Sequence, residues 1–120
     1  MKILVVDDSR VMRQIVCRTL RQAGFVDLHI VEAENGVHAC DVIAAESPDL
    51  VLSDWNMPEM TGIELLAHLR NNGQQVPFGF VTSEGTQEMR DRASAAGAMF
   101  LVAKPFTADM FKDALAPVLG

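Results

Sequence analysis

The sequence predicts an α/β protein with a parallel sheet, because two kinds of segment alternate along the whole chain. Five short apolar runs, rich in valine, isoleucine, leucine and phenylalanine, are typical of strands buried on both faces. Five segments with helical features follow these runs in turn. The expected strands are Lys2–Val6, Leu28–Ala33, Asp49–Ser53, Phe78–Thr82 and Phe100–Ala103.

The first two helices are predicted from apolar spacing and from the residues that stop them. The first has apolar residues at helical spacing, Val11, Ile15, Val16 and Leu20, and Gly24 follows as a stop signal. After an Asn-Gly turn, the second runs from Val37 to about Glu46. Its shared face is expected to carry Val37, Cys40 and Ala44, with Val42 and Ile43 nearby.

The remaining three helices have different local signals. Thr61 and Glu64 form a capping-box pattern that opens the third, with Ile63, Leu66 and Leu69 expected inward. The fourth, 86–96, is rich in alanine and has Met89 as its only sizeable apolar residue, which predicts light packing. The fifth, 107–119, carries Phe111, Leu115 and Val118 on one stripe. Gly79 weakens the fourth strand or marks a close approach of another group.

Length and charge limit the function classes. A chain of 120 residues is expected to form one domain, residues 1–120. The formal net charge of −6 argues against a nucleic-acid binder, which needs a basic patch. No apolar run approaches the roughly 20 residues needed to span a bilayer, and the N-terminus lacks a signal-peptide pattern, so a cytoplasmic protein is expected. Cys17 and Cys40 are expected as free thiols in helices.

Chemically active side chains stand just past the expected strands. Three carboxylates come first, from Asp7 and Asp8 after the first strand and Asp54 after the third. The fourth strand ends in Thr82 and Ser83, and Lys104 follows the fifth. Because ligand sites of parallel sheets lie beyond the carboxyl ends of the strands, these groups are expected on one rim.

The chemistry of this rim points to phosphoryl transfer. Crowded carboxylates repel one another, and Mg²⁺ is a natural neutraliser because it takes oxygen ligands. A carboxylate is also a nucleophile toward phosphorus, and transfer depends mainly on positioning and charge neutralisation. Mg²⁺, the Lys104 ammonium and the Thr82 hydroxyl would each cover one phosphoryl oxygen.

Each group taken alone has a simpler interpretation. Asp7 and Asp8 suit the N-terminus of a helix, and Asp54 suits a turn. Thr82 suits the end of a strand, and Lys104 suits an exposed loop. Four separate strand ends that each supply a required group favour the functional interpretation. Trp55, directly after Asp54, is expected to border the site, with an ordinary surface aromatic as the alternative.

Four motifs together, ILVVDDS, SDWNMPEMTG, VTSEG and AKPF, resemble the receiver domain of two-component response regulators. The resemblance is closest to the single-domain chemotaxis regulators and extends over essentially the whole chain. It implies the flavodoxin-like, doubly wound fold with strand order 2-1-3-4-5 and five helices. It also implies a signalling protein that catalyses only its own phosphorylation and dephosphorylation.

The resemblance further implies roles for individual residues. Asp54 would accept a phosphoryl group from a sensor histidine kinase or a phosphotransfer protein. Mg²⁺ would be held by Asp7, Asp8, Asp54 and the backbone carbonyl of Asn56. The peptide bond between Lys104 and Pro105 would be cis, and Lys104 would contact the phosphoryl group.

The signal would leave through the face formed by the fourth helix, the fifth strand and the fifth helix. Thr82 and Ser83 would bind the phosphoryl group, and Asn56 and Glu84 would tune its lifetime. An unidentified downstream protein or output domain would bind this face, and the chain would be a monomer or a weak homodimer.

The sequence departs from the family at two points. Leu101 stands where the usual switch has an aromatic residue, and Phe100 cannot substitute because neighbouring strand residues face opposite ways. An altered switch, a phosphate reservoir and a constitutive docking module therefore all stay open. Residues 84–88 also lack the lysines with which the chemotaxis relatives meet the flagellar motor, so motor binding is not predicted.

A phosphatase of the haloacid-dehalogenase kind is the alternative from another class. Such enzymes also use an aspartate nucleophile with Mg²⁺, but they have a D-x-D-x-T motif after the first strand and a cap domain. Here the first strand is followed by Asp7-Asp8-Ser9, and the remaining residues leave no cap. Turnover of a small phosphate ester would favour this alternative.

Overall fold

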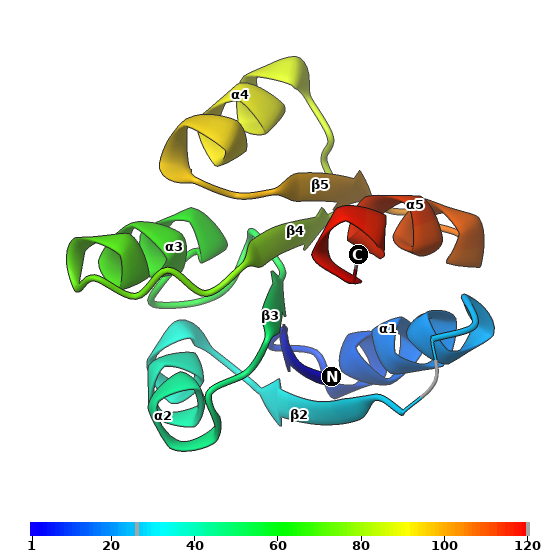
Figure 1. Cartoon of the computed structure of the whole chain (residues 1–120). Helices are drawn as coiled ribbons and strands as arrows, with labels where there is room; N and C mark the ends of the chain where they lie inside the picture. Colours follow the sequence, from blue (N-terminus) through cyan, green and yellow to red (C-terminus); the bar gives the residue numbers. More distant parts are fainter. Residues whose placement is uncertain (26, 120) are drawn as a thin grey trace.

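The computed structural model describes residues 1–25 and 27–119, and it contains five parallel strands and five helices in alternation (Figure 1). The strands are β1 (Lys2–Val6), β2 (His29–Ala33), β3 (Leu50–Ser53), β4 (Phe78–Thr82) and β5 (Phe100–Ala103). The helices are α1 (Arg10–Gln22), α2 (Gly36–Glu46), α3 (Gly62–Asn71), α4 (Gln87–Ala96) and α5 (Ala108–Leu119). The sheet order is β2-β1-β3-β4-β5. This confirms the predicted doubly wound, flavodoxin-like fold.

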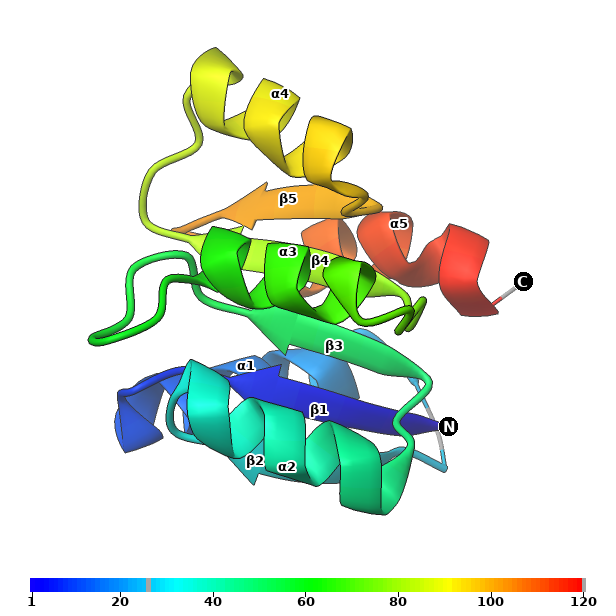
Figure 2. The ribbon, with the colours of Figure 1, turned by 90° about the vertical axis from the view of Figure 1, so that its left-hand side faces the viewer.

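The helices cover the sheet on both sides. Helices α1 and α5 lie on one face, and α2, α3 and α4 lie on the other (Figures 1 and 2). Each face therefore has its own hydrophobic core, one built around Leu20, Phe111 and Leu115 and the other around Leu65, Leu66 and Phe80. Every residue of β3 and β4 is buried, as expected for inner strands of a covered parallel sheet.

The boundaries of the strands and helices agree to within one residue with those predicted from the sequence. Strands β1, β4 and β5 have the predicted ends, and β2 and β3 each begin one residue later than predicted. Helices α4 and α5 also begin one residue later, because Thr86 and Thr107 act as caps. Their hydroxyls accept the backbone N–H groups of Met89 and Met110.

The predicted face of α2 is wrong for Val37 and Ala44, whereas Cys40 does pack against the core. The buried residues are Gly36, Ala39 and Ile43, whereas Val37 is 55% exposed and Ala44 is also exposed. The helix is apolar on several sides, so its sequence did not select a single stripe. Met60 packs against this end of the helix at Gly36, where a Cβ would clash with the methionine sulfur.

The inward faces of α1 and α3 are also displaced from the predicted ones. In α1, Val16 and Leu20 are buried as expected, but Val11 and Ile15 are exposed. In α3, Leu65 joins the expected leucines in the core, and Ile63 is only partly buried. The predicted stripe of α5 holds for its two large residues, since Phe111 and Leu115 are fully buried.

Gly79 marks the close approach of another group, which was one of the two interpretations of this glycine from the sequence. It pairs with Phe100 across β4 and β5, and the Phe100 ring lies over the space that a side chain at position 79 would fill. The predicted light packing of α4 is also confirmed, because Ala93 is its only fully buried residue. Within residues 1–25 and 27–119, no helix combines the length and apolar character needed to cross a membrane.

Candidate functional site

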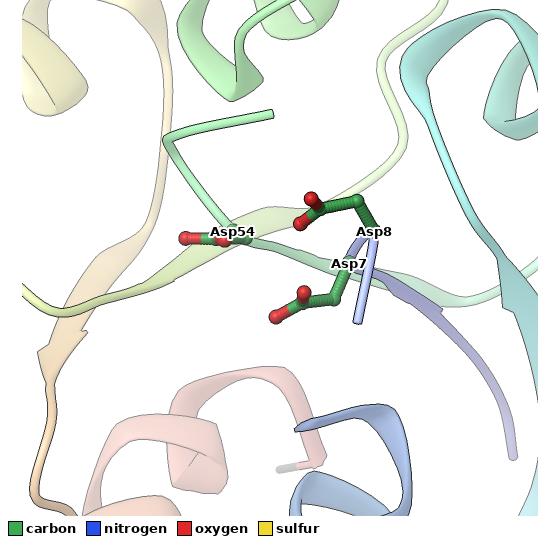
Figure 3. A group of neighbouring side chains, drawn as sticks. All are labelled: Asp7, Asp8 and Asp54. Atoms are coloured by element: carbon green, nitrogen blue, oxygen red, sulfur yellow. The ribbon is translucent and has the colours of Figure 1, made fainter. Parts of the chain in front are cut away.

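The adjacent strands β1 and β3 bring three aspartates together. Val6 pairs with Ser53 in the parallel ladder, so the residues that follow them, Asp7 and Asp54, leave the sheet at the same level. The backbone N–H of Asp54 donates to the carbonyl of Val6 at 2.9 Å, which fixes this end of β3. Carboxylate oxygens of Asp7, Asp8 and Asp54 all lie within 4.8 Å of one another (Figure 3).

Asp7 is the most enclosed of the three carboxylates. It is only 4% exposed, and its Oδ1 accepts the backbone N–H of Ser9 at 2.9 Å. Burial raises the pKa of Asp7 to about 6; the Asp54 and Asp8 charges add to the rise, while the Ser9 N–H and the Lys104 ammonium oppose it. The pocket therefore penalises its own negative charge and favours the entry of a cation.

Asp54 is a largely buried carboxylate with defined backbone donors. Its Oδ1 accepts the N–H of Trp55 at 2.8 Å, and its side chain is 12% exposed. Burial raises the pKa of Asp54, while the Lys104 ammonium and the N–H groups of Trp55 and Asn56 oppose the rise. The carboxylate is thus oriented by the backbone and stays accessible from the rim.

Lys104 supplies the positive charge of the site. Its Nζ lies 3.8 Å from Asp7 Oδ2 and 4.0 Å from Asp54 Oδ1, so it faces both carboxylates. Its backbone N–H donates to the carbonyl of Thr82 at 2.7 Å, which ties the ends of β4 and β5 together. The bond between Lys104 and Pro105 is cis, as the resemblance implied.

The residues expected to bind or sense a phosphoryl group occupy different environments. Thr82 is fully buried at the end of β4, and its Oγ1 accepts the N–H of Glu84 at 3.2 Å. Ser83 and Glu84 are exposed. Leu101 packs with the core beneath α2, α3 and α4, whereas Phe100 packs with the opposite core, so the two do face opposite ways.

Trp55 is 5% exposed, so its interpretation as a surface aromatic is wrong. Its ring packs on Phe80 with the centroids 4.7 Å apart, and the Arg92 guanidinium lies 5.4 Å from the ring centroid. Because the backbone N–H of Trp55 also binds the Asp54 carboxylate, this tryptophan links Asp54 to the core and to α4.

Two residues that support the site were missed by sequence reasoning. Gly62 begins α3 so close to the site that a Cβ there would clash with the backbone carbonyl of Asp54. Arg13 is 13% exposed; its Nη1 donates to the carbonyl of Asp7 at 2.6 Å, and its Nε pairs with Glu32 at 2.9 Å. The glycine of the SDWNMPEMTG motif was a usable signal for Gly62, but nothing in the spacing of α1 singles out Arg13.

The donor set fits Mg²⁺. Three carboxylates from two adjacent strand ends lie within reach of a single ion, and all of them are hard oxygen ligands. The burial of Asp7 and the partial burial of Asp54, together with their raised pKa values, show a charge imbalance that a divalent cation would relieve. Asn56, two residues after Asp54, is exposed at the same rim.

Comparison with known proteins shows the family of the chain. The model of the response regulator receiver domain matches residues 3–116. The chain belongs to the response regulator receiver family. Chemotaxis protein CheY1 of Helicobacter pylori (strain J99) is 42% identical, with 100% of this chain and 98% of the relative covered. A chemotaxis protein CheY homolog of Campylobacter jejuni (strain 81-176) is also 42% identical, with 93% of the relative covered.

Solved receiver structures share the whole fold. Chemotaxis protein CheY4 of Vibrio cholerae superimposes with a TM-score of 0.84 at 34% identity, covering 98% of this chain and 97% of that one. The receiver domain of the putative regulator NarL of Mycobacterium tuberculosis gives a TM-score of 0.86 at 27% identity, covering 99% and 96%. The chain is therefore a receiver of the chemotaxis-regulator type. Members of this family change state when they are phosphorylated.

Proposed function

We propose that Asp54 is the phosphoacceptor of this receiver and that the donor is a phosphohistidine on a sensor histidine kinase or a phosphotransfer protein. The observation that carries the proposal is the position of Asp54, which shares a pocket with two carboxylates and has the Lys104 ammonium 4.0 Å from its Oδ1. An aspartate that only formed a turn would need neither the two neighbouring carboxylates nor the Lys104 ammonium.

The transfer is a displacement at phosphorus. An Asp54 carboxylate oxygen forms the new O–P bond while the N–P bond of the phosphohistidine breaks, and the imidazole nitrogen leaves with the electron pair. The N–H groups that bind Asp54 hold its carboxylate in one orientation for the attack. The Lys104 ammonium faces the charge that develops on the phosphoryl oxygens.

Asp7, Asp8, Asp54 and the backbone carbonyl of Asn56 would hold Mg²⁺. When bound, Mg²⁺ neutralises phosphoryl oxygens and offsets the carboxylate charges. Arg13 holds the carbonyl of Asp7, which keeps the first of these ligands in place. The chain is a signalling protein and acts as a catalyst only on its own acyl phosphate.

Phosphorylation then changes partner binding through the face of α4, β5 and α5. Thr82 is the last residue of β4, next to β5, and a new phosphoryl oxygen is an acceptor for its hydroxyl. Ser83, exposed beside it, binds the phosphoryl group together with Thr82. Asn56 and Glu84, which are also exposed, tune the lifetime of the phosphoryl group. A downstream protein or an output domain is the partner that this face serves.

Leu101 favours a second candidate function, a phosphate reservoir or a constitutive docking module. It has no ring or hydroxyl to turn inward when Thr82 engages a phosphoryl group. The two functions differ in one observable: a switch changes the α4–β5–α5 face on phosphorylation, and a reservoir does not. Amide hydrogen exchange over that face distinguishes them.

The acceptor is tested by intact mass spectrometry after incubation with acetyl phosphate and Mg²⁺. Wild type is expected to gain the mass of one phosphoryl group. Asp54→Asn is expected to gain none, because an amide is not a nucleophile of this kind. Asp41→Asn, on the exposed side of α2, is the matched control and should behave as wild type. Undiminished uptake by Asp54→Asn would refute the assignment.

A further inference from the structure

We propose that Arg90 of α4 couples the phosphoryl site to the edge strand β5, through the main chain of Leu101 rather than through its side chain. The inference rests on the proposed function of Asp54 and concerns how its phosphorylation reaches the outer face of the molecule. It gives position 101 a role in switching that does not need an aromatic ring.

Arg90 bridges two backbone carbonyls that belong to different parts of the site. Its Nε donates to the carbonyl of Gly85 at 3.3 Å, in the loop between β4 and α4. Its Nη1 donates to the carbonyl of Leu101 at 3.1 Å, on β5. Because β5 is an edge strand, its outer carbonyls have no neighbouring strand to supply N–H donors. The Arg90 guanidinium donates to one of these carbonyls in place of a strand.

The other end of this connection lies at Thr82. The N–H of Glu84 donates to Thr82 Oγ1 at 3.2 Å, and Glu84 directly precedes Gly85. A hydroxyl that donates its hydrogen to a phosphoryl oxygen keeps a lone pair for the Glu84 N–H. When the Thr82 hydroxyl turns toward the phosphoryl group, residues 84 and 85 therefore follow, and the carbonyl that Arg90 holds moves with them.

Gly85 is fitted to this contact. A Cβ at that position would lie 2.8 Å from the Cβ of Ala103 and 3.1 Å from Nη2 of Arg90. The loop therefore runs directly against β5 and the guanidinium, where any side chain would separate them. Only arginine presents several donors in a rigid fork, so lysine cannot hold both carbonyls in the same geometry.

Helix α4 is free to respond to this connection. Ala93 is its only fully buried residue, and the Arg92 guanidinium lies over the Trp55 ring, next to the site. A groove of about 190 Å³ lies between α4 and β5, and Arg90 is among the residues that line it. Movement of the Gly85 carbonyl thus changes the distance between the helix and the strand along this groove.

The test is hydrogen exchange of the full chain with and without acetyl phosphate and Mg²⁺, followed by mass spectrometry of peptides spanning residues 84–103. Arg90→Gln removes the bridge, and Arg90→Lys keeps the charge without the fork. Arg18→Gln is the matched control, since it removes an exposed arginine of α1 on the opposite face of the sheet. Intact mass measures the phosphoryl adduct of each variant in the same samples.

Wild type and Arg18→Gln are expected to show a change in exchange over α4 and β5 on phosphorylation. In Arg90→Gln and Arg90→Lys this change should fall by at least about threefold while the adduct forms as in wild type. A change as large as that of wild type in both Arg90 variants would overturn the inference alone. Failure of wild type to form the adduct would instead overturn the proposed function, and the inference with it.

Discussion

At the scale of single residues, the buried carboxylate of Asp7 lowers the stability of the fold when it is ionised. Its carboxyl is 4% exposed and has a pKa of about 6 in the fold, against 3.8 for the unperturbed group. The folded state therefore binds the Asp7 proton more tightly than the unfolded state does. Protonation of Asp7 therefore stabilises the folded state. This contribution to the free energy of unfolding is complete below pH 3.8 and is lost as the pH rises through 6, a loss of about 3 kcal/mol.

Asp7→Asn is accordingly expected to stabilise the metal-free protein at pH 8, by about 1–3 kcal/mol. The amide stays neutral at all pH values, and its oxygen can still accept the Ser9 N–H. The gain should shrink toward zero at pH 4, where the wild-type carboxyl is itself protonated. Urea unfolding at both pH values without divalent metal measures this.

The control for this prediction is Asp113→Asn, on the exposed side of α5, which should change stability by less than about 0.5 kcal/mol at either pH. An equal or lower stability of Asp7→Asn at pH 8 would show that burial of the Asp7 charge does not carry the cost described.

The residues of the site were predictable where each one ends a strand. Asp7, Asp54 and Lys104 all follow apolar runs, and the parallel arrangement then forces them to one rim. Arg13 was not predictable in this way. Its role depends on a contact between the first turns of α1 and the end of β1, and helical periodicity carries no information about the carbonyl that an arginine reaches.

At the scale of elements, the pairing of β4 and β5 depends on a glycine and a ring. Gly79→Ala is expected to destabilise the fold by about 1–3 kcal/mol, because the new methyl group would overlap the Phe100 ring. Phe100→Leu in the same chain should recover part of the loss, since the smaller side chain leaves room for the methyl group. Urea unfolding of the two single variants and the double variant gives the coupling energy.

Additive losses in the double variant would show that the ring and position 79 do not share one space. The prediction concerns the strand that carries Leu101 and precedes Lys104, so a displaced β5 should also weaken phosphoryl uptake. The two readouts together report on packing and on the site.

Strands were more predictable than helix faces for a physical reason. A strand buried on both sides must be apolar throughout, so its ends coincide with the ends of the apolar run. In α2 many residues are apolar, and the face that turns inward carries the small Gly36 and Ala39, with Gly36 packed against Met60. That choice belongs to tertiary packing and leaves no periodic signal in the segment.

At the scale of the whole molecule, the strand order makes the site. With β1 and β3 adjacent at the centre, the aspartates share one pocket, while β4 and β5 bring Thr82 and Lys104 from the other side. The alternation of elements predicted a parallel sheet, but the order itself came from the resemblance, because alternation alone allows several windings. The lightly packed α4 lies beyond β5, where a signal from the rim can move it at low cost.

The central claim is that the three-carboxylate rim is a metal-dependent phosphoacceptor site. The most direct measurement is the intact mass of the wild-type chain after incubation with acetyl phosphate, once with Mg²⁺ and once with EDTA in its place. The account predicts a single phosphoryl adduct with Mg²⁺ and none with EDTA. An adduct that forms equally well in both, or in neither, would contradict it.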